Sequence, residues 1–147
     1  ICAQNPHDLF VTVFYGILDP ATGALHYVNA GHNPPMTVRA HGAVVPLALT
    51  GGVAVGVMEE LPYEEATVTL APGETLFLFT DGISEAMNAE MEEFGDDRLI
   101  AALTGKHGQP VKSVLETVID TVGAFVGDAP QSDDITCLVV RYNGAVA

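Results

Sequence analysis

The stretch Thr75-Leu-Phe-Leu-Phe-Thr-Asp-Gly-Ile-Ser-Glu-Ala-Met-Asn88 decides how the fold of this chain is interpreted. Its first five residues are apolar or β-branched and predict a buried strand, and Asp81-Gly82 is a dipeptide suited to a tight turn. The Asp81 carboxylate is therefore expected at a strand end, where a rigid element holds a ligand group that still faces solvent. Beyond the turn, Ser84 is expected to cap a short helical turn with Glu85 in its first turn.

A second acidic turn occupies residues 132–136, immediately before an apolar run at residues 137–141. Hard divalent cations prefer carboxylate and water oxygens, and they usually take one or two carboxylates each. Asp81 and Asp133 fit that ligand set, with Asp134 as a third candidate. Two such ions about 4 Å apart could activate a bridging water for in-line displacement at phosphorus. Taken singly, each acidic dipeptide is a weak signal and is better explained as an ordinary turn.

The other strands are expected to alternate with turn residues along the first half of the chain. They are expected at residues 8–18, 24–30, 36–39, 44–49 and 63–70. The first two flank a turn and predict a hairpin, and the next two predict another strand pair. Residues 63–70 are expected to form a further hairpin with the central strand, because residues 71–74 have turn chemistry.

Two helices are expected late in the chain. Residues 95–105 begin with capping aspartates and end at a glycine, and residues 111–126 carry apolar side chains at spacings of three and four. The last strand, residues 135–142, is nearly all apolar, which favours a central position covered on both faces. Strands that lie together, followed by grouped helices, predict an α+β fold with antiparallel pairing.

Length and composition indicate one globular domain. The chain has 147 residues, 48% of them hydrophobic, and it starts at Ile1 with an apolar strand close behind, so we expect a piece of something longer. The formal net charge of −14 disfavours nucleic acid and anionic membranes as partners. An acidic surface also suits a protein that collects divalent cations, but solubility alone is the more frequent reason for such a charge. Cys2 and Cys137 do not form a disulfide framework; Cys137 is expected in the core, and a reducing cytoplasm is the natural setting. No apolar run approaches the length of a membrane span.

The loop at residues 31–35 is expected to be stiff, because its adjacent prolines fix the backbone and remove donors. His32 in this loop can act as a ligand, but a structural hydrogen bond is the more frequent role of such a histidine. The glycine-spaced residues 50–57 lack the lysine and hydroxyl of a phosphate-binding loop and favour close backbone packing. No role is assigned to the other histidines, which are His7, His26, His41 and His107.

Together these features resemble the PPM family of metal-dependent serine/threonine phosphatases, in the bacterial branch typified by SpoIIE and by stress-response regulators of sigma factors. The resembling segments are residues 10–18, 27–35, the loop containing Gly56, and residues 72–74, 79–88, 94–95 and 133–136. The resemblance implies a sandwich of two antiparallel sheets flanked by helices, with a metal site at one edge between them. It makes Asp81 and Asp133 catalytic metal ligands, places Asp134 where it holds water, and implies a dinuclear Mn²⁺ or Mg²⁺ cofactor.

The activity that this resemblance implies is hydrolysis of phosphoserine or phosphothreonine by metal-activated water, without a covalent phosphoenzyme. Its implied substrate is a phosphorylated protein, such as a small anti-sigma factor antagonist. The family also has an earlier glycine-rich, aspartate-containing metal motif and a helix pair, and neither precedes Asp8 here. We therefore expect residues 1–143 to be the C-terminal portion of one phosphatase domain, incomplete at its N-terminus, with residues 144–147 as a tail. Alone, it is expected to bind Mn²⁺ poorly.

Two other interpretations stay open. The chain could be a degenerate phosphatase that acts as a non-catalytic regulatory binding module, or an unrelated all-β ligand binder. The latter requires the turns at Asp81 and Asp133 to lie far apart.

Overall fold

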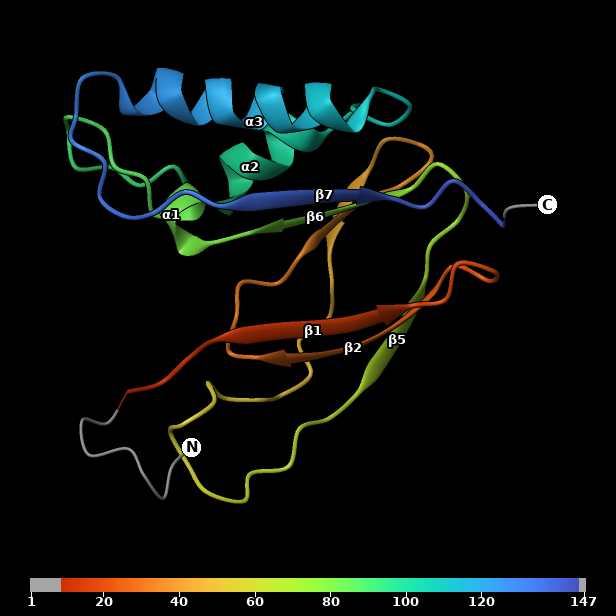
Figure 1. Cartoon of the computed structure of the whole chain (residues 1–147). Helices are drawn as coiled ribbons and strands as arrows, with labels where there is room; N and C mark the ends of the chain where they lie inside the picture. The colour runs from red at the N-terminus through yellow and green to blue at the C-terminus, as the bar shows by residue number, and fades with distance from the viewer. Residues whose placement is uncertain (1–8, 146–147) are drawn as a thin grey trace.

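The computed structural model describes residues 9–145 of the chain (Figure 1). Cys2, His7 and the end of the expected tail lie outside these residues. The elements in chain order are β1 (Val13–Leu18), β2 (Ala24–Ala30), β3 (Met36–Val38), β4 (Val44–Pro46), β5 (Ala66–Thr69), β6 (Thr75–Phe79), α1 (Asp81–Ser84), α2 (Gly95–Leu103), α3 (Val111–Val126) and β7 (Cys137–Arg141). None of the helices in this part of the chain is both long and apolar enough to cross a bilayer.

The strands form two antiparallel sheets, with order β1-β2-β5 in one and β4-β3-β6-β7 in the other. Figure 1 shows the sheets stacked, with α2 and α3 covering the outer face of the four-stranded sheet. The predicted α+β fold, an antiparallel sandwich flanked by helices, is confirmed. The predicted β1–β2 hairpin and β3–β4 pair are also present, as are both long helices.

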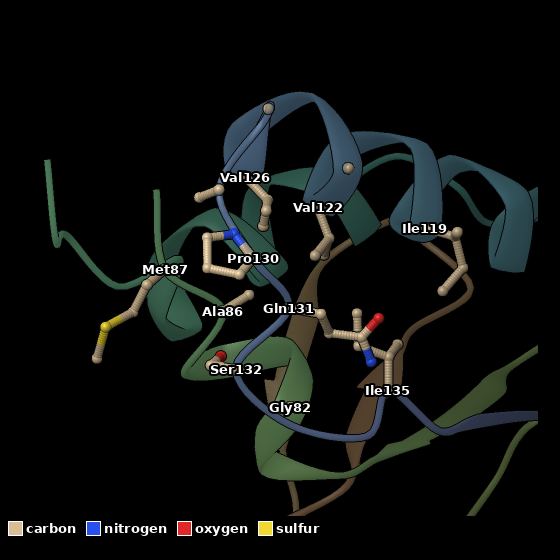
Figure 2. A pocket seen from close by; sticks show the side chains of 13 residues that line it. Gly82, Ala86, Met87, Ile119, Val122, Val126, Pro130, Gln131, Ser132 and Ile135 are labelled. Atoms are coloured by element: carbon tan, nitrogen blue, oxygen red, sulfur yellow. The ribbon is translucent and has the colours of Figure 1, made fainter. Parts of the chain in front are cut away.

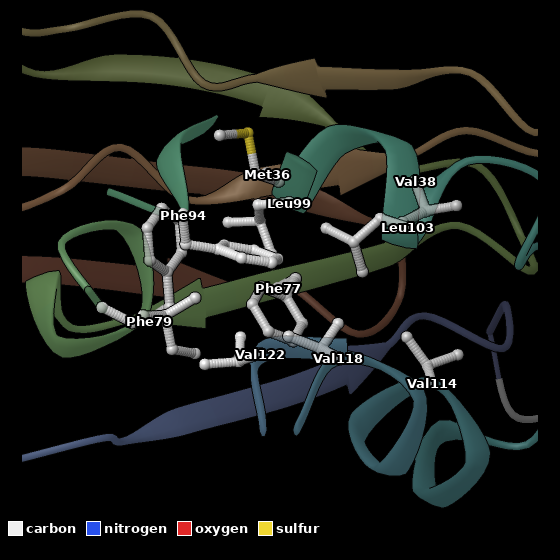
Figure 3. Packing of buried hydrophobic residues seen from close by; sticks show 12 residues of the cluster. Met36, Val38, Phe77, Phe79, Phe94, Leu99, Leu103, Val114, Val118 and Val122 are labelled. Atoms are coloured by element: carbon white, nitrogen blue, oxygen red, sulfur yellow. The ribbon is translucent and has the colours of Figure 1, made fainter. Parts of the chain in front are cut away.

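The main core lies between the four-stranded sheet and its helices. Val114, Val118 and Val122 are buried on one face of α3 and point toward Phe77 of β6 (Figure 3). The apolar stripe of this helix therefore packs on a sheet, as its spacing predicted. Because side chains alternate along a strand, Leu76 points the other way and packs between the two sheets. One strand thus contributes to both cores.

The expected hairpin between residues 63–70 and the central strand is wrong. β5 pairs with β2 in the three-stranded sheet, with Val68 opposite Leu25. β6 has no edge left for β5, because β3 and β7 occupy both of its sides. Residues 71–74 therefore carry the chain from one sheet to the other instead of closing a hairpin.

The expected central position of the last strand is also wrong. Among the described strands β7 pairs only with β6 and lies at the end of the sheet order. Leu138 on this strand keeps 56% of its surface exposed. Cys137 is partly buried and packs against the main core, as expected, and burial raises the pKa of its thiol. An apolar run records how hydrophobic a strand is, but it does not fix how many neighbours the strand has.

Candidate active site

The first acidic turn follows directly from the end of β6. Thr80 is extended, and Asp81 is the first residue of α1, a single turn in which the Glu85 amide donates to the Asp81 carbonyl at 2.7 Å. Ser84 was expected to begin this turn but ends it; its Oγ donates to the Asp81 carbonyl at 3.4 Å. The chain becomes helical earlier than predicted because the extended Thr80 takes the position before the helix. Asp81 is exposed at the strand end, as expected.

The second acidic turn is held against the first by Thr80. The Thr80 amide donates to the Thr136 carbonyl at 3.0 Å, and the Thr80 hydroxyl donates to the Asp134 carbonyl at 2.9 Å, across 54 positions of sequence. In return the Thr136 amide donates to the Thr80 hydroxyl at 3.0 Å. The structure therefore brings together the backbones that carry Asp81, Asp133 and Asp134. It does not place the two turns on opposite sides of the molecule.

Gly82 makes this contact possible. A Cβ atom at this position would lie 2.4 Å from the Asp134 carbonyl oxygen, far inside van der Waals contact with a backbone atom. Only glycine allows such a close backbone approach. The dipeptide Asp81-Gly82 therefore has two functions: one residue carries the carboxylate, and the other admits the neighbouring turn.

The three carboxylates are exposed and make few hydrogen bonds. Asp81 accepts a bond from the Gly82 amide at 3.1 Å, and Asp133 accepts one from the Asp134 amide at 2.6 Å. Within residues 9–145 no salt bridge with a lysine, arginine or histidine reaches any of the three. Their remaining lone pairs face solvent and are available to a ligand.

This donor set fits a hard cation that keeps several waters. Mg²⁺ and similar ions are held by one or two carboxylates plus water and substrate phosphate. Among the described residues, no group of three or more histidine, cysteine, aspartate or glutamate side chains is arranged to hold an ion. Asp81, Asp133 and Asp134 therefore do not form a three-ligand cluster in the described residues, and a cation at these turns would take most of its coordination from water and other ligands.

A contact between the loop at residues 31–35 and α1 was not predicted from the sequence. The Asn33 amide Nδ2 donates to the Ser84 hydroxyl at 3.2 Å. The loop is held in turn by Asn29, whose side chain bonds both the carbonyl and the amide of His32 at 2.8 Å. The His32 ring lies 3.2 Å from the Thr12 hydroxyl, which fits the structural role expected for it. The sequence feature that could have pointed to this contact is a polar residue, Asn33, placed directly before two prolines that stiffen the loop.

The fold and these contacts define the class of a PPM-type phosphatase domain, and comparison with known proteins supports the same class. Residues 1–143 match the family described as Stage II sporulation protein E (SpoIIE). The chain belongs to this family, and the resemblance drawn from its motifs is confirmed.

Individual relatives show the same relationship. The chain is 33% identical over 135 residues to Protein IcfG of Synechocystis sp. (strain ATCC 27184 / PCC 6803 / Kazusa), a match that covers 92% of this chain and 21% of that protein. It is 23% identical over 137 residues to Phosphoserine phosphatase RsbU of Bacillus subtilis (strain 168), covering 91% and 39%. The structure of the SiaA-PP2C domain of Pseudomonas aeruginosa superposes with a TM-score of 0.69 at 29% identity, covering 82% of this chain and 47% of that one. The chain thus spans about a fifth to two fifths of the length of these curated relatives.

Proposed function

We propose that this chain is part of a metal-dependent protein serine/threonine phosphatase that hydrolyses phosphoserine or phosphothreonine. The observation that carries the proposal is the contact between the two acidic turns through Thr80 and Gly82. Family membership supports it, since the relative RsbU is described as a phosphoserine phosphatase. Within the proposal the setting is the cytoplasm, in sigma-factor partner switching, and the substrate is a phosphorylated protein such as an anti-sigma factor antagonist.

In this proposal Asp81 and Asp133 hold the cofactor, Mn²⁺ or Mg²⁺, and Asp134 orients water beside them. When bound, such ions polarise a phosphoryl oxygen and lower the pKa of a water molecule. Without a cation, the carboxylates of the two acidic turns on a chain of charge −14 would repel a phosphate dianion. The carboxylates therefore make phosphate binding depend on the metal. Their exposure leaves the site open to a protein-sized substrate.

The test replaces Asp81 or Asp133 by asparagine in the complete gene product and measures Mn²⁺-dependent turnover of a phosphoserine peptide. Loss of a supporting partner around a metal costs about 10- to 100-fold, so loss of a ligand is expected to cost at least about 100-fold. Asp97→Asn, an exposed position in the first turn of α2, is the matched control and should keep full activity. Unchanged turnover in both site variants would exclude these residues from the mechanism. Absence of Mn²⁺-dependent turnover in the wild type would instead favour the non-catalytic binding module.

A further inference from the structure

A pocket of about 270 Å³ lies beside the acidic turns, between α1, the C-terminal half of α3 and the loop before β7 (Figure 2). Val122 and Val126 reach it from the helix, and Ala86 and Pro130 lie opposite. None of the residues that line this pocket carries a charge. Its walls are therefore suited to an apolar group.

The pocket and the candidate active site share a wall. Gly82 and Ser132 both line the pocket, and each is the direct neighbour of a carboxylate of the site, Asp81 and Asp133. The Ser132 hydroxyl contacts the Glu85 carbonyl at 3.5 Å, which ties the loop before β7 to α1 at this wall. A phosphorylated polypeptide whose phosphate lies at the acidic turns would therefore have the pocket next to it.

The surface around the pocket is acidic. Three exposed acidic residues lie near the segments that form it: Glu85 directly after α1, Asp128 two residues after the end of α3, and Asp133 in the loop before β7. No salt bridge to any of these three is present in the part of the chain that the structure describes. An apolar group with positively charged neighbours is complementary to this surface, because opposite charges around an apolar contact favour encounter and fix orientation.

We propose that this pocket binds an apolar side chain of the phosphoprotein substrate, of the size of leucine or methionine, flanked by lysine or arginine. The side chain belongs to the same segment as the phosphoserine. This inference rests on the proposed phosphatase function and adds to it a determinant of sequence preference. The volume, about 270 Å³, lies just below the range typical of pockets for whole ligands, which starts near 300 Å³, and is large enough for a side chain of this size.

Gly123 allows the pocket to be filled without damage to the fold. It lies in α3, lines the pocket, and a Cβ atom at this position meets nothing within 4 Å. Gly123→Leu therefore places a side chain in the pocket and also replaces a poor helix former with a good one. Ala124→Leu is the matched control, because residue 124 is exposed on the same helix and does not line the pocket.

The experiment uses the complete gene product and two phosphoserine peptides with the same basic residues. One peptide has leucine on either side of the phosphoserine and the other has serine there. Three quantities are measured: kcat/KM for each peptide, kcat/KM for p-nitrophenyl phosphate, and peptide affinity by fluorescence anisotropy. The wild type should prefer the leucine peptide by about tenfold, the discrimination typical of an apolar pocket. Gly123→Leu should abolish that preference and leave the serine peptide and the small ester unchanged, whereas Ala124→Leu should retain it.

The outcomes separate this inference from the function on which it rests. Turnover of p-nitrophenyl phosphate without preference between the peptides would overturn the pocket assignment and leave the phosphatase proposal standing. Absence of turnover on every substrate would overturn the phosphatase proposal, and the anisotropy ratio would then decide on the pocket alone. A fall in thermal stability with Gly123→Leu but not with Ala124→Leu would show that another segment of the protein fills the pocket, and would overturn the inference.

Discussion

A carboxylate lies at each end of β6, and the two carboxylates differ in burial and in hydrogen bonding. Glu74 precedes the strand, is only 6% exposed, and accepts hydrogen bonds from the Arg39 guanidinium at 3.0 Å and from the amides of Ala71 and Ala40 at 3.1 and 3.2 Å. Asp81 follows the strand, is exposed, and accepts a bond from the amide next to it. The Glu74 carboxylate is held by three hydrogen bonds within the fold, whereas the Asp81 carboxylate keeps most of its lone pairs for a ligand.

The pKa of the buried carboxylate shows how completely it is satisfied. Burial raises the pKa of Glu74, but the amides of Ala71 and Ala40 and the charge of Arg39 more than offset this, so its pKa lies below 4.5. Three parts of the chain meet at this residue, since its backbone carbonyl also accepts the Tyr142 amide at 3.0 Å. Glu74 therefore stabilises the fold, whereas Asp81 remains available to a ligand.

The largest effect on stability is expected from Glu74→Gln. The substitution keeps the size of the side chain but removes the negative charge, which leaves Arg39 partly buried and unpaired and turns an acceptor into a donor. Breaking such a pair costs about 3 kcal/mol of unfolding free energy. Urea denaturation measures the loss. Glu65→Gln, at an exposed partner of His26, is the matched control and should change little. Equal stability of both variants would show that the Glu74 contacts contribute nothing net.

The same residue predicts a pH dependence. Because the pKa of Glu74 is lower in the folded state than its ordinary value of 4.5, its contribution is fully present above that value and is lost as the pH falls through the folded pKa. Denaturation midpoints of the wild type should therefore drop in acid more steeply than those of Glu74→Gln. Parallel curves for the two proteins would contradict this assignment.

A smaller loss, about 2 kcal/mol, is expected for Gly82→Ala. The added Cβ would meet the Asp134 carbonyl at 2.4 Å, so the two acidic turns must move apart. Gly123→Ala in α3 is the control, because space there is open and alanine favours a helix; it should stabilise the protein. The same substitution is thus expected to have opposite signs at the two positions. A neutral Gly82→Ala would mean that the turns tolerate separation.

Local patterns predicted most of the elements at both ends of β6. The apolar run of β6 and the stripe of α3 are properties of contiguous residues, so the sequence reveals them directly. Partner choice is not local, and for this reason β5 was paired with the wrong sheet and β7 was placed in the centre. The Thr80 to Asp134 contact that joins the acidic turns, and the hydrogen bond from Asn33 to Ser84, span more than 50 positions and leave no periodic signal.

The next smaller effect, about 1 kcal/mol, is expected for Asn33→Ala, which removes the hydrogen bond to Ser84 on α1. Because α1 begins at Asp81, the Mn²⁺ concentration for half-maximal turnover should rise a few-fold while KM for the peptide stays constant. Thr12→Val is the control: it removes the contact with His32 in the same loop but not the contact with α1. Equal shifts in both variants would show that the loop acts through general rigidity and not through Asn33.

The smallest effect on stability is expected for Asp81→Asn, although it makes the same chemical change as Glu74→Gln at the opposite end of the strand. An exposed carboxylate bonded to its neighbouring amide loses little on becoming an amide, so the unfolding free energy should change by less than about 0.5 kcal/mol. Urea denaturation in the absence of metal measures this change in unfolding free energy without a contribution from a bound cation. If the Asp81→Asn variant keeps its stability and loses its turnover, Asp81 acts in catalysis or metal binding and not in folding. If instead Asp81→Asn destabilises the fold as much as Glu74→Gln, both ends of β6 carry structural carboxylates, and the metal must be held elsewhere.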